Sequence, residues 1–175
     1  MEFKPVFMDN KRYDTISDLI YKSYPQACIL YIDEVVNRGL ESAFEDRKAV
    51  IAANRGLVDV QQMFHGTKEE NINKIARWGF DPTLNTRSAY GYGVYFARDA
   101  SYSKEYMHAS EPKKPTFMFL ADVLIGTKKQ GGCKGDSSYD NNCDSFDNPR
   151  IITTVYSDGA YPRYIVAFHK EAKWA

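Results

Sequence analysis

The 175-residue sequence predicts an α+β fold built around a mostly antiparallel β-sheet. Apolar runs of strand length alternate with segments of helical periodicity, and two strand patterns follow each other at the end of the chain with no helix between them. A chain of this length corresponds to about one domain, with a core large enough to need no disulfide or metal. We therefore expect residues 1–175 to form a single domain.

The composition excludes several classes of protein. The 23 basic residues are balanced by 23 acidic ones, so the chain lacks the basic surface of a nucleic-acid-binding protein. Hydrophobic residues make up 43% of the chain, too many for disorder, yet no apolar run approaches a membrane span. The N-terminal residues lack the basic and apolar segments of a secretory signal. We expect an intracellular monomer, cytoplasmic or nuclear, that binds neither nucleic acid nor membrane.

Cysteine and histidine are too few and too scattered for a metal site. Cys28, Cys133 and Cys143 are an odd number and form no Cys-x-x-Cys pair, which predicts reduced, free thiols. None of the three histidines lies at metal-ligand spacing from another ligand. We expect no bound metal.

Two helices and two strands are predicted before residue 65. Asp14 and Thr15 are the capping candidates of the first helix, and Gly56 ends the second. The predicted ranges are helix 15–24, strand 27–32, helix 40–53 and strand 58–64.

A third helix is predicted from a capping-box pattern, because Glu70 follows Thr67 by three residues and Gly79 is placed to end the helix. A loop over 81–93, rich in Pro, Asn, Thr, Ser and Gly, leads into a short strand at 94–97. Loops held by a rigid scaffold often carry function, so this junction is a candidate ligand site.

The rest of the chain predicts a helix, a central strand and a closing hairpin. Asp99 is the capping candidate of the helix, and Asp122 is the one charge in the central strand. Residues 127–149 are polar and predict a surface excursion long enough to suggest a function. The predicted ranges are helix 100–109, strand 116–125, strand 151–156, hairpin turn 157–159 and strand 164–169.

The candidate chemistry gathers at one strand end. The Gly91-Tyr92-Gly93 sequence precedes a strand instead of following one, so it is no phosphate-binding loop. His65 and Gly66 offer an imidazole beside an unobstructed backbone amide and carbonyl, which suits a planar amide ligand. Tyr95 and Tyr106 are candidates for enclosing that ligand. On these residues alone, a structural histidine and ordinary core or rim aromatics remain an equal alternative.

Six sequence blocks within about residues 25–170 resemble, in order, the catalytic domain of the poly(ADP-ribose) polymerase family, the diphtheria-toxin-like ADP-ribosyltransferases. These blocks are residues 61–67, 78–80, 90–97, 119–126, 148–151 and 160–164. The resemblance implies the ADP-ribosyltransferase fold, a mostly antiparallel split β-sheet flanked by short helices. It also implies NAD as the ADP-ribose donor, and the chain is too short to include the family's helical autoinhibitory domain.

The resemblance implies a role for each candidate residue. His65 corresponds to the histidine that bonds the adenosine ribose of NAD, and the backbone of Gly66 would hold the nicotinamide amide together with the Ser103 hydroxyl. Tyr95 and Tyr106 would enclose the nicotinamide ring. The implied donor-binding residues are His65, Gly66, Thr67, Tyr95, Ser103 and Tyr106, and the implied catalytic triad is His65, Tyr95 and Ile151.

Ile151 is the informative departure, because the chain-elongating members have Glu at this position and the mono-ADP-ribosylating branch does not. An Ile side chain has no acceptor and no titratable group. We therefore expect transfer of a single ADP-ribose unit from NAD to a protein side chain, Asp or Glu, with release of nicotinamide. The alternative is an inactive domain of the same fold that binds a partner or nucleotide. A Gly66→Trp substitution is expected to block the site and leave the fold intact.

The resemblance also implies roles for two loops. Residues 81–89 would be the loop covering the donor, shorter here than in many relatives. Residues 139–144 resemble a Tyr-Asp-x-Cys-x-Asp stretch of mono-transferring relatives, with one extra residue, and would border the acceptor. An ordinary solvated loop is an equal alternative for the second.

Overall fold

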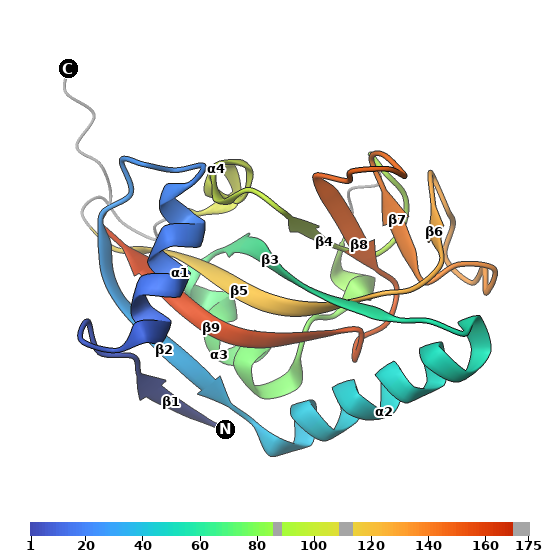
Figure 1. The fold of residues 1–175 in the computed structure, drawn as a ribbon, viewed down its shortest axis with the longest axis horizontal. Coiled ribbons are helices and arrows are strands. Elements are labelled where there is room, and N and C mark those ends of the chain that lie inside the picture. Colours follow the sequence, from blue (N-terminus) through green and yellow to red (C-terminus); the bar gives the residue numbers. More distant parts are fainter. Residues whose placement is uncertain (86–88, 109–113, 170–175) are drawn as a thin grey trace.

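The computed structural model describes residues 1–85, 89–108 and 114–169 (Figure 1). Within these ranges the strands are β1 (Glu2–Pro5), β2 (Ile29–Val36), β3 (Asp59–Thr67), β4 (Val94–Ala97), β5 (Thr116–Ile125), β6 (Lys128–Lys129), β7 (Asn141–Cys143), β8 (Ile151–Thr154) and β9 (Ala160–Phe168). The helices are α1 (Lys11–Tyr21), α2 (Arg38–Arg55), α3 (Glu69–Trp78) and α4 (Ala100–Ser103), with 3₁₀ turns η1 (Pro82–Leu84) and η2 (Lys104–Tyr106).

All nine described strands belong to one sheet, in the order β1-β2-β9-β5-β3-β4-β8-β7-β6. Every neighbouring pair is antiparallel except β6 and β7. The predicted α+β class with a mostly antiparallel sheet is therefore confirmed.

The sheet is split between β3 and β4. β3 pairs with β5 along its whole length, but it meets β4 only at Phe64 opposite Ala97. Figure 1 shows β4, β8, β7 and β6 grouped apart from the longer strands β3, β5 and β9. Beyond Phe64 one edge of β3 is therefore left without a neighbouring strand.

The central strand β5 packs on both of its faces. Side chains alternate along a strand, so Phe119 joins the cluster that contains Phe80, while Leu120 joins the cluster that contains Ile16 and Ile20 of α1. Burial on both faces explains why residues 116–125 lack the polar alternation of a half-exposed strand. The predicted range of this strand is exact, as is that of β4.

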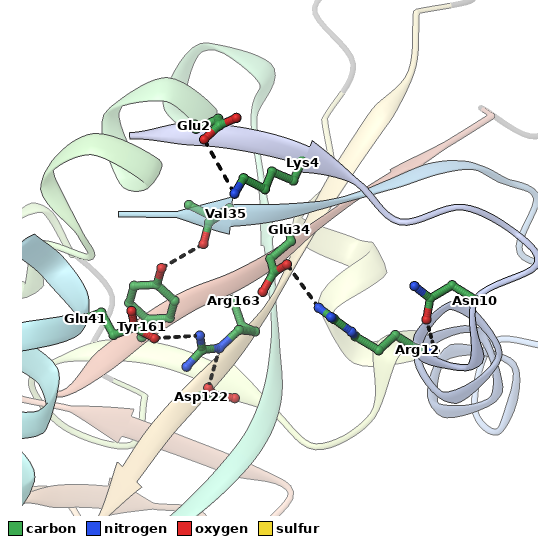
Figure 2. A network of polar contacts seen from close by, with 10 residues as sticks. All are labelled: Glu2, Lys4, Asn10, Arg12, Glu34, Val35, Glu41, Asp122, Tyr161 and Arg163. Carbon is green, nitrogen blue, oxygen red and sulfur yellow. Dashed lines mark hydrogen bonds and ion pairs between the residues drawn. The ribbon is translucent and has the colours of Figure 1, made fainter. Parts of the chain in front are cut away.

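The one charge in β5 has a partner in β9 (Figure 2). The guanidinium of Arg163 donates to Asp122 at 2.8 Å and to Glu41 of α2 at 3.1 Å. The hydroxyl of Tyr161 donates to the carbonyl of Val35 at 2.7 Å. These contacts tie β9 to β5, β2 and α2, and they explain how a carboxylate is tolerated in the middle of the sheet.

Several helix starts differ from the prediction. α1 begins at Lys11 because the side chain of Asn10 accepts from the amide of Arg12, so the predicted caps Asp14 and Thr15 lie within the helix. The capping box is also wrong, since Thr67 ends β3 opposite Phe117 and the helix begins after it. The first turn of α1 is polar and shows no apolar periodicity, which explains why the start of this helix was predicted too late.

The glycines that end helices are where the sequence places them. Gly56 follows α2 with φ 79° and Gly79 follows α3 with φ 81°, a backbone region that glycine enters without strain. The helix predicted over 100–109 is instead α4 followed by η2, and the side chain of Asp99 makes no capping bond. The predicted end at Ala109 lies outside the described residues.

The predicted closing hairpin is wrong. β8 pairs with β4 and β7, whereas β9 pairs with β2 and β5, so the two last strands lie in opposite halves of the split sheet. The turn around Ser157 to Gly159 therefore crosses from one half to the other. A sequence-adjacent strand pair is the usual arrangement, and the split overrides it here.

The predicted surface excursion over 127–149 is partly wrong, because its second half enters the core. Asn141 and Asn142 have no exposed surface. The side-chain amide of Asn141 donates to the carbonyls of Leu124 and Thr153, and the side-chain amide of Asn142 donates to the carbonyl of Tyr92. Buried polar groups that are fully hydrogen-bonded are stable inside a protein, and hydropathy cannot identify them.

The three cysteines are all free, as predicted, and Cys143 is buried. In the described ranges no helix has the length and apolar character to span a bilayer.

Candidate active site

A cavity of about 960 Å³ opens where the sheet splits. It lies beside the free edge of β3 and is bounded by α3, η1, β4 and the α4–η2 segment. Every residue implied by the family resemblance contributes to its wall. These residues are His65, Gly66, Thr67, Tyr95, Ser103, Tyr106 and Ile151.

Gly66 presents backbone groups to this cavity. The carbonyl of Phe64 accepts from the hydroxyl of Ser103 at 3.0 Å, and Phe64 is the residue that pairs with β4. The backbone groups of residues two apart in a strand point to the same side, so the N–H and C=O of Gly66 point to the free edge of β3. A donor and an acceptor in line on one edge match a primary carboxamide.

Gly66 is also needed for packing. A Cβ at this position would lie 2.0 Å from the carbonyl oxygen of Ser103 and 3.2 Å from the Cβ of Tyr106. The close approach of α4 and η2 to β3 therefore requires glycine. The expectation that Gly66→Trp leaves the fold intact is wrong, because the first side-chain atom meets backbone before it reaches the cavity.

His65 is held in one orientation and one protonation state. Its Nδ1 lies 2.9 Å from the carbonyl oxygen of Tyr95, so Nδ1 carries the proton and Nε2 is left as an acceptor. The ring packs against Phe80 and Phe96 at centroid distances of 5.1 and 5.5 Å. Burial lowers the pKa of His65 from its ordinary value of 6.5, which favours the neutral ring.

Tyr95 forms the opposite wall and is fixed at its hydroxyl. Its Oη donates to the carbonyl of Gly91 at 2.7 Å and accepts from the amide of Tyr90 at 3.0 Å. These two bonds tie β4 to the end of the loop before it. Burial raises the pKa of Tyr95, so the phenol stays neutral across the physiological range.

Tyr106 closes the cavity from the η2 side. Its hydroxyl is hydrogen-bonded to that of Tyr102 at 3.4 Å, and this contact, together with burial, raises the pKa of Tyr102 to about 12. Tyr106 keeps 36% of its surface exposed. A half-exposed ring beside Gly66 is suited to stack on a flat ligand held by the glycine edge.

Ile151 begins β8, pairs with Ala97 of β4, lines the cavity and is 2% exposed. Its amide and that of Arg150 both donate to Oδ1 of Asp144, at 3.1 and 3.0 Å. The side chain contributes only carbon to the wall, as the sequence predicts. A second cavity of about 310 Å³ lies beyond it and shares Tyr90, Tyr102 and Ile151 with the first.

Residues 139–144 line neither of these cavities. Residues 139–143 are buried in and beside β7, so nothing within the described ranges supports the expectation that 139–144 border the acceptor. Of the loop expected to cover the donor, Asp81, Leu84, Asn85 and Ala89 line the larger cavity. Residues 86–88 lie outside the described residues.

Sequence reasoning missed one face of α3. Asn71, Lys74, Ile75 and Trp78 all line the cavity, and their spacing of i, i+3, i+4 and i+7 places them on one helical stripe. Ile75 also packs against the core with Ile72 and Ala76, so the signal that the sequence offered was the polar and aromatic set Asn71, Lys74 and Trp78 beside that apolar face. Across the described residues, no group of three His, Cys, Asp or Glu side chains is placed to hold a metal ion.

A split antiparallel sheet with a His-Gly strand end and tyrosine walls defines a domain of the ADP-ribosyltransferase fold class. The model of the poly(ADP-ribose) polymerase catalytic domain matches residues 10–138, and the chain belongs to this family. Domains of this family are NAD-dependent transferases.

The relatives of this chain include mono-ADP-ribosyltransferases of mammals. Human protein mono-ADP-ribosyltransferase PARP11 is 30% identical over 94% of this chain and 58% of its own length. Mouse protein mono-ADP-ribosyltransferase PARP12 is 27% identical over 98% of this chain and 26% of its own length. The chain therefore spans less than two thirds of these relatives.

Proposed function

We propose that this domain transfers one ADP-ribose unit from NAD to a protein side chain and releases nicotinamide, without extending a chain. The observation that carries the proposal is the cavity at the split of the sheet, which has directed polar groups at the end of β3 and only carbon at the start of β8. The names of the relatives support the same activity.

In this proposal the end of β3 positions the donor. The N–H and C=O of Gly66 hold the nicotinamide carboxamide, and the Ser103 hydroxyl, whose proton goes to Phe64, accepts from the amide nitrogen. The rings of Tyr95 and Tyr106 enclose the pyridine. Nε2 of His65 accepts from a hydroxyl of the adenosine ribose, which requires the neutral ring that burial favours.

The reaction breaks the bond between the anomeric carbon and the pyridine nitrogen, and the bonding electrons leave with nicotinamide. A fixed orientation of the two ends of the donor lets positive charge develop at the anomeric carbon. An acceptor carboxylate of Asp or Glu is already ionised near neutral pH, so its oxygen can form the new bond with no proton to remove. A sugar hydroxyl needs a base, and Ile151 supplies none.

The test measures label transfer and nicotinamide release together. The protein is incubated with NAD labelled in the adenine half, with and without candidate acceptor proteins, and both gel mobility and free nicotinamide are followed. We expect discrete labelled bands and nicotinamide in equal amount. A ladder of chains would contradict single transfer, and NAD binding without nicotinamide release would favour an inactive binding domain.

A further inference from the structure

The stretch 139–144, which the proposed function does not use, is hydrogen-bonded to the segment just before β4. Asn142 of this stretch has no exposed surface and lines neither cavity. Its side-chain amide donates to the carbonyl of Tyr92 at 2.7 Å, and its Oδ1 accepts from the amide of Gly132 at 2.7 Å. The amide of Tyr92 donates to the carbonyl of Gly132 at 2.9 Å. The three residues are thus joined in a closed ring of hydrogen bonds.

Two glycines beside Asn142 show how closely this ring is packed. A Cβ on Gly91 would lie 2.5 Å from Cγ of Asn142, and a Cβ on Gly132 would lie 2.8 Å from its Oδ1. Gly91 also has φ 111°, in a backbone region that glycine enters without strain. The side chain of Asn142 is therefore packed against backbone on two sides, and both contacts require glycine.

The segment held by this ring of hydrogen bonds fixes the hydroxyl of Tyr95. Oη of Tyr95 donates to the carbonyl of Gly91 at 2.7 Å and accepts from the amide of Tyr90 at 3.0 Å, and both partners directly precede Tyr92. The carbonyl of Tyr95 in turn lies 2.9 Å from Nδ1 of His65. A displacement of this segment would therefore move a wall of the larger cavity.

Thr153 of β8 supports the same carbonyl as Asn142. Its hydroxyl donates to the carbonyl of Tyr92 at 3.2 Å and accepts from the backbone amide of Asn142 at 3.1 Å. Thr153 has no exposed surface either. Residues 90–92 lie outside every named helix and strand, so these side-chain bonds, together with the bridge to Gly132, have to hold them.

Asn141 is equally buried, but it holds a different part of the fold. Its Oδ1 accepts from the amide of Gly126 at 2.8 Å, and its side-chain amide donates to the carbonyls of Leu124 at 2.9 Å and Thr153 at 3.1 Å. None of these partners belongs to residues 90–95. The two neighbouring asparagines therefore offer a matched pair, because one holds the end of β5 and the other holds the segment before β4.

We infer that Asn142 is a positioning residue of the donor site, which acts by holding residues 90–92 where they bond the hydroxyl of Tyr95. This inference rests on the proposed function, in which the ring of Tyr95 encloses the nicotinamide. It gives the stretch 139–144 a role behind the donor wall in place of the expected border of the acceptor.

Substitution of the two asparagines tests the inference. Asn142→Leu and Asn141→Leu each replace a buried amide by an apolar side chain, and each should lower Tm by about 3–10 °C, because buried backbone groups lose their partners. Well below both Tm values, Asn142→Leu should raise the Kd for nicotinamide about tenfold, the upper end of what one ring contact contributes. Asn141→Leu should change this Kd by less than about twofold. An equal effect of the two variants on the Kd would overturn the inference.

A double-mutant cycle identifies the route. Tyr95→Phe keeps the ring but cannot bond the carbonyl of Gly91, so in that background Asn142→Leu should raise the Kd for nicotinamide by less than about twofold. An undiminished tenfold rise would show that Asn142 does not act through the hydroxyl of Tyr95, and the inference would be wrong.

Thr153→Val provides a milder variant in case Asn142→Leu does not fold. It removes one of the two side-chain bonds to the carbonyl of Tyr92 and should raise the Kd for nicotinamide about threefold, whereas an unchanged Kd would contradict the inference. If the parent protein transfers label and the Asn142 and Thr153 variants bind nicotinamide normally, the inference is wrong while the proposed function stands. If the parent protein neither binds nicotinamide nor transfers label, both fail.

Discussion

The end of β3 and the start of β8 face the same cavity but differ in what they offer a reactant. At β3 the backbone of Gly66, the hydroxyl of Ser103 and the imidazole of His65 are directed polar groups. At β8 the wall is Ile151, whose backbone amide is already bonded to Asp144. In the proposed function the first end holds the donor, and the second offers no group to activate an acceptor.

If the proposed function is correct, donor activation and acceptor activation depend on different walls of one cavity. A proton-accepting group at the second end would make sugar hydroxyls competent acceptors, and its loss removes them without touching the donor. A substitution at one of these walls should therefore leave the function of the other unchanged. Each substitution below tests this expectation.

The largest effect is expected at Gly66. In Gly66→Ala the new Cβ meets the Ser103 carbonyl at 2.0 Å, which pushes α4 away from β3. We expect label transfer to fall more than about 100-fold, because misplacement by an ångström has that effect. Thermal unfolding should show a loss of about 1–3 kcal/mol. Gly39→Ala is the matched control, since its Cβ makes only an ordinary 3.5 Å contact in α2. Full activity of Gly66→Ala would disprove the assigned edge.

His65 is expected to have the next largest effect. His65→Ala removes the Nε2 acceptor and should lower kcat/KM for NAD about 100-fold. The Kd for free nicotinamide should stay within about twofold, because the glycine edge is untouched. An equal loss of nicotinamide affinity would show that His65 serves the amide and not the ribose.

Ile151→Glu tests whether a carboxylate at the start of β8 permits chain elongation. We expect no chain elongation on gels of the labelled product, since a second ADP-ribose also needs a binding site of its own. A buried carboxylate should destabilise the fold, because Ile151 is 2% exposed. Ile151→Gln, of the same size as the Glu variant and uncharged, separates charge from shape. Chains formed by Ile151→Glu but not by Ile151→Gln would mean that the missing base alone prevents elongation.

The donor end was far more predictable from sequence than its surroundings. β4 and β5 match their predicted ranges because each is a continuous apolar run, with Gly93 before one and Gly126 after the other. His65 and Gly66 were identified because a short motif carries their chemistry. Tyr95 and Tyr106 were named as aromatic candidates from the sequence, but only the family resemblance gave Ser103 a role and gave both rings a ligand.

The parts that sequence could not supply depend on long-range polar contacts. The sequence predicts Asn141 and Asn142 in a surface excursion. Yet the side-chain amide of Asn141 donates to the strand carbonyls of Leu124 and Thr153, and that of Asn142 donates to the carbonyl of Tyr92 just before β4. The pairing of β8 with β4 depends on where the sheet splits, and no local sequence pattern indicates the position of that split. Trp78 was missed as a residue that lines the cavity, because the surroundings of an exposed aromatic are known only once its neighbours in space are known.

The pH dependence should follow His65, and its effect should be smaller than those of the substitutions at Gly66, His65 and Ile151. Its folded pKa is lowered from 6.5, so the neutral ring contributes stability that is present above the unfolded pKa and lost as pH falls through the folded one. We expect Tm to fall between pH 7 and pH 5, and KM for NAD to rise over the same interval. In His65→Gln the part of the Tm change due to this group should disappear. An unchanged pH profile in His65→Gln would show that other groups control it.

The smallest effect is expected at Asp144, which holds the inert end in place. Asp144→Ala leaves the amides of Arg150 and Ile151 unpaired, and the free energy of unfolding should fall by about 1–3 kcal/mol. Asp144→Asn keeps an accepting oxygen and should lose less, and Asp147→Ala, an exposed neighbour, should change stability by less than about 0.5 kcal/mol. KM for NAD should be unaffected, because no donor-binding group contacts Asp144 in the described structure. A tenfold rise in KM would mean that the start of β8 also orders the donor, and the two ends of the cavity would then act as one.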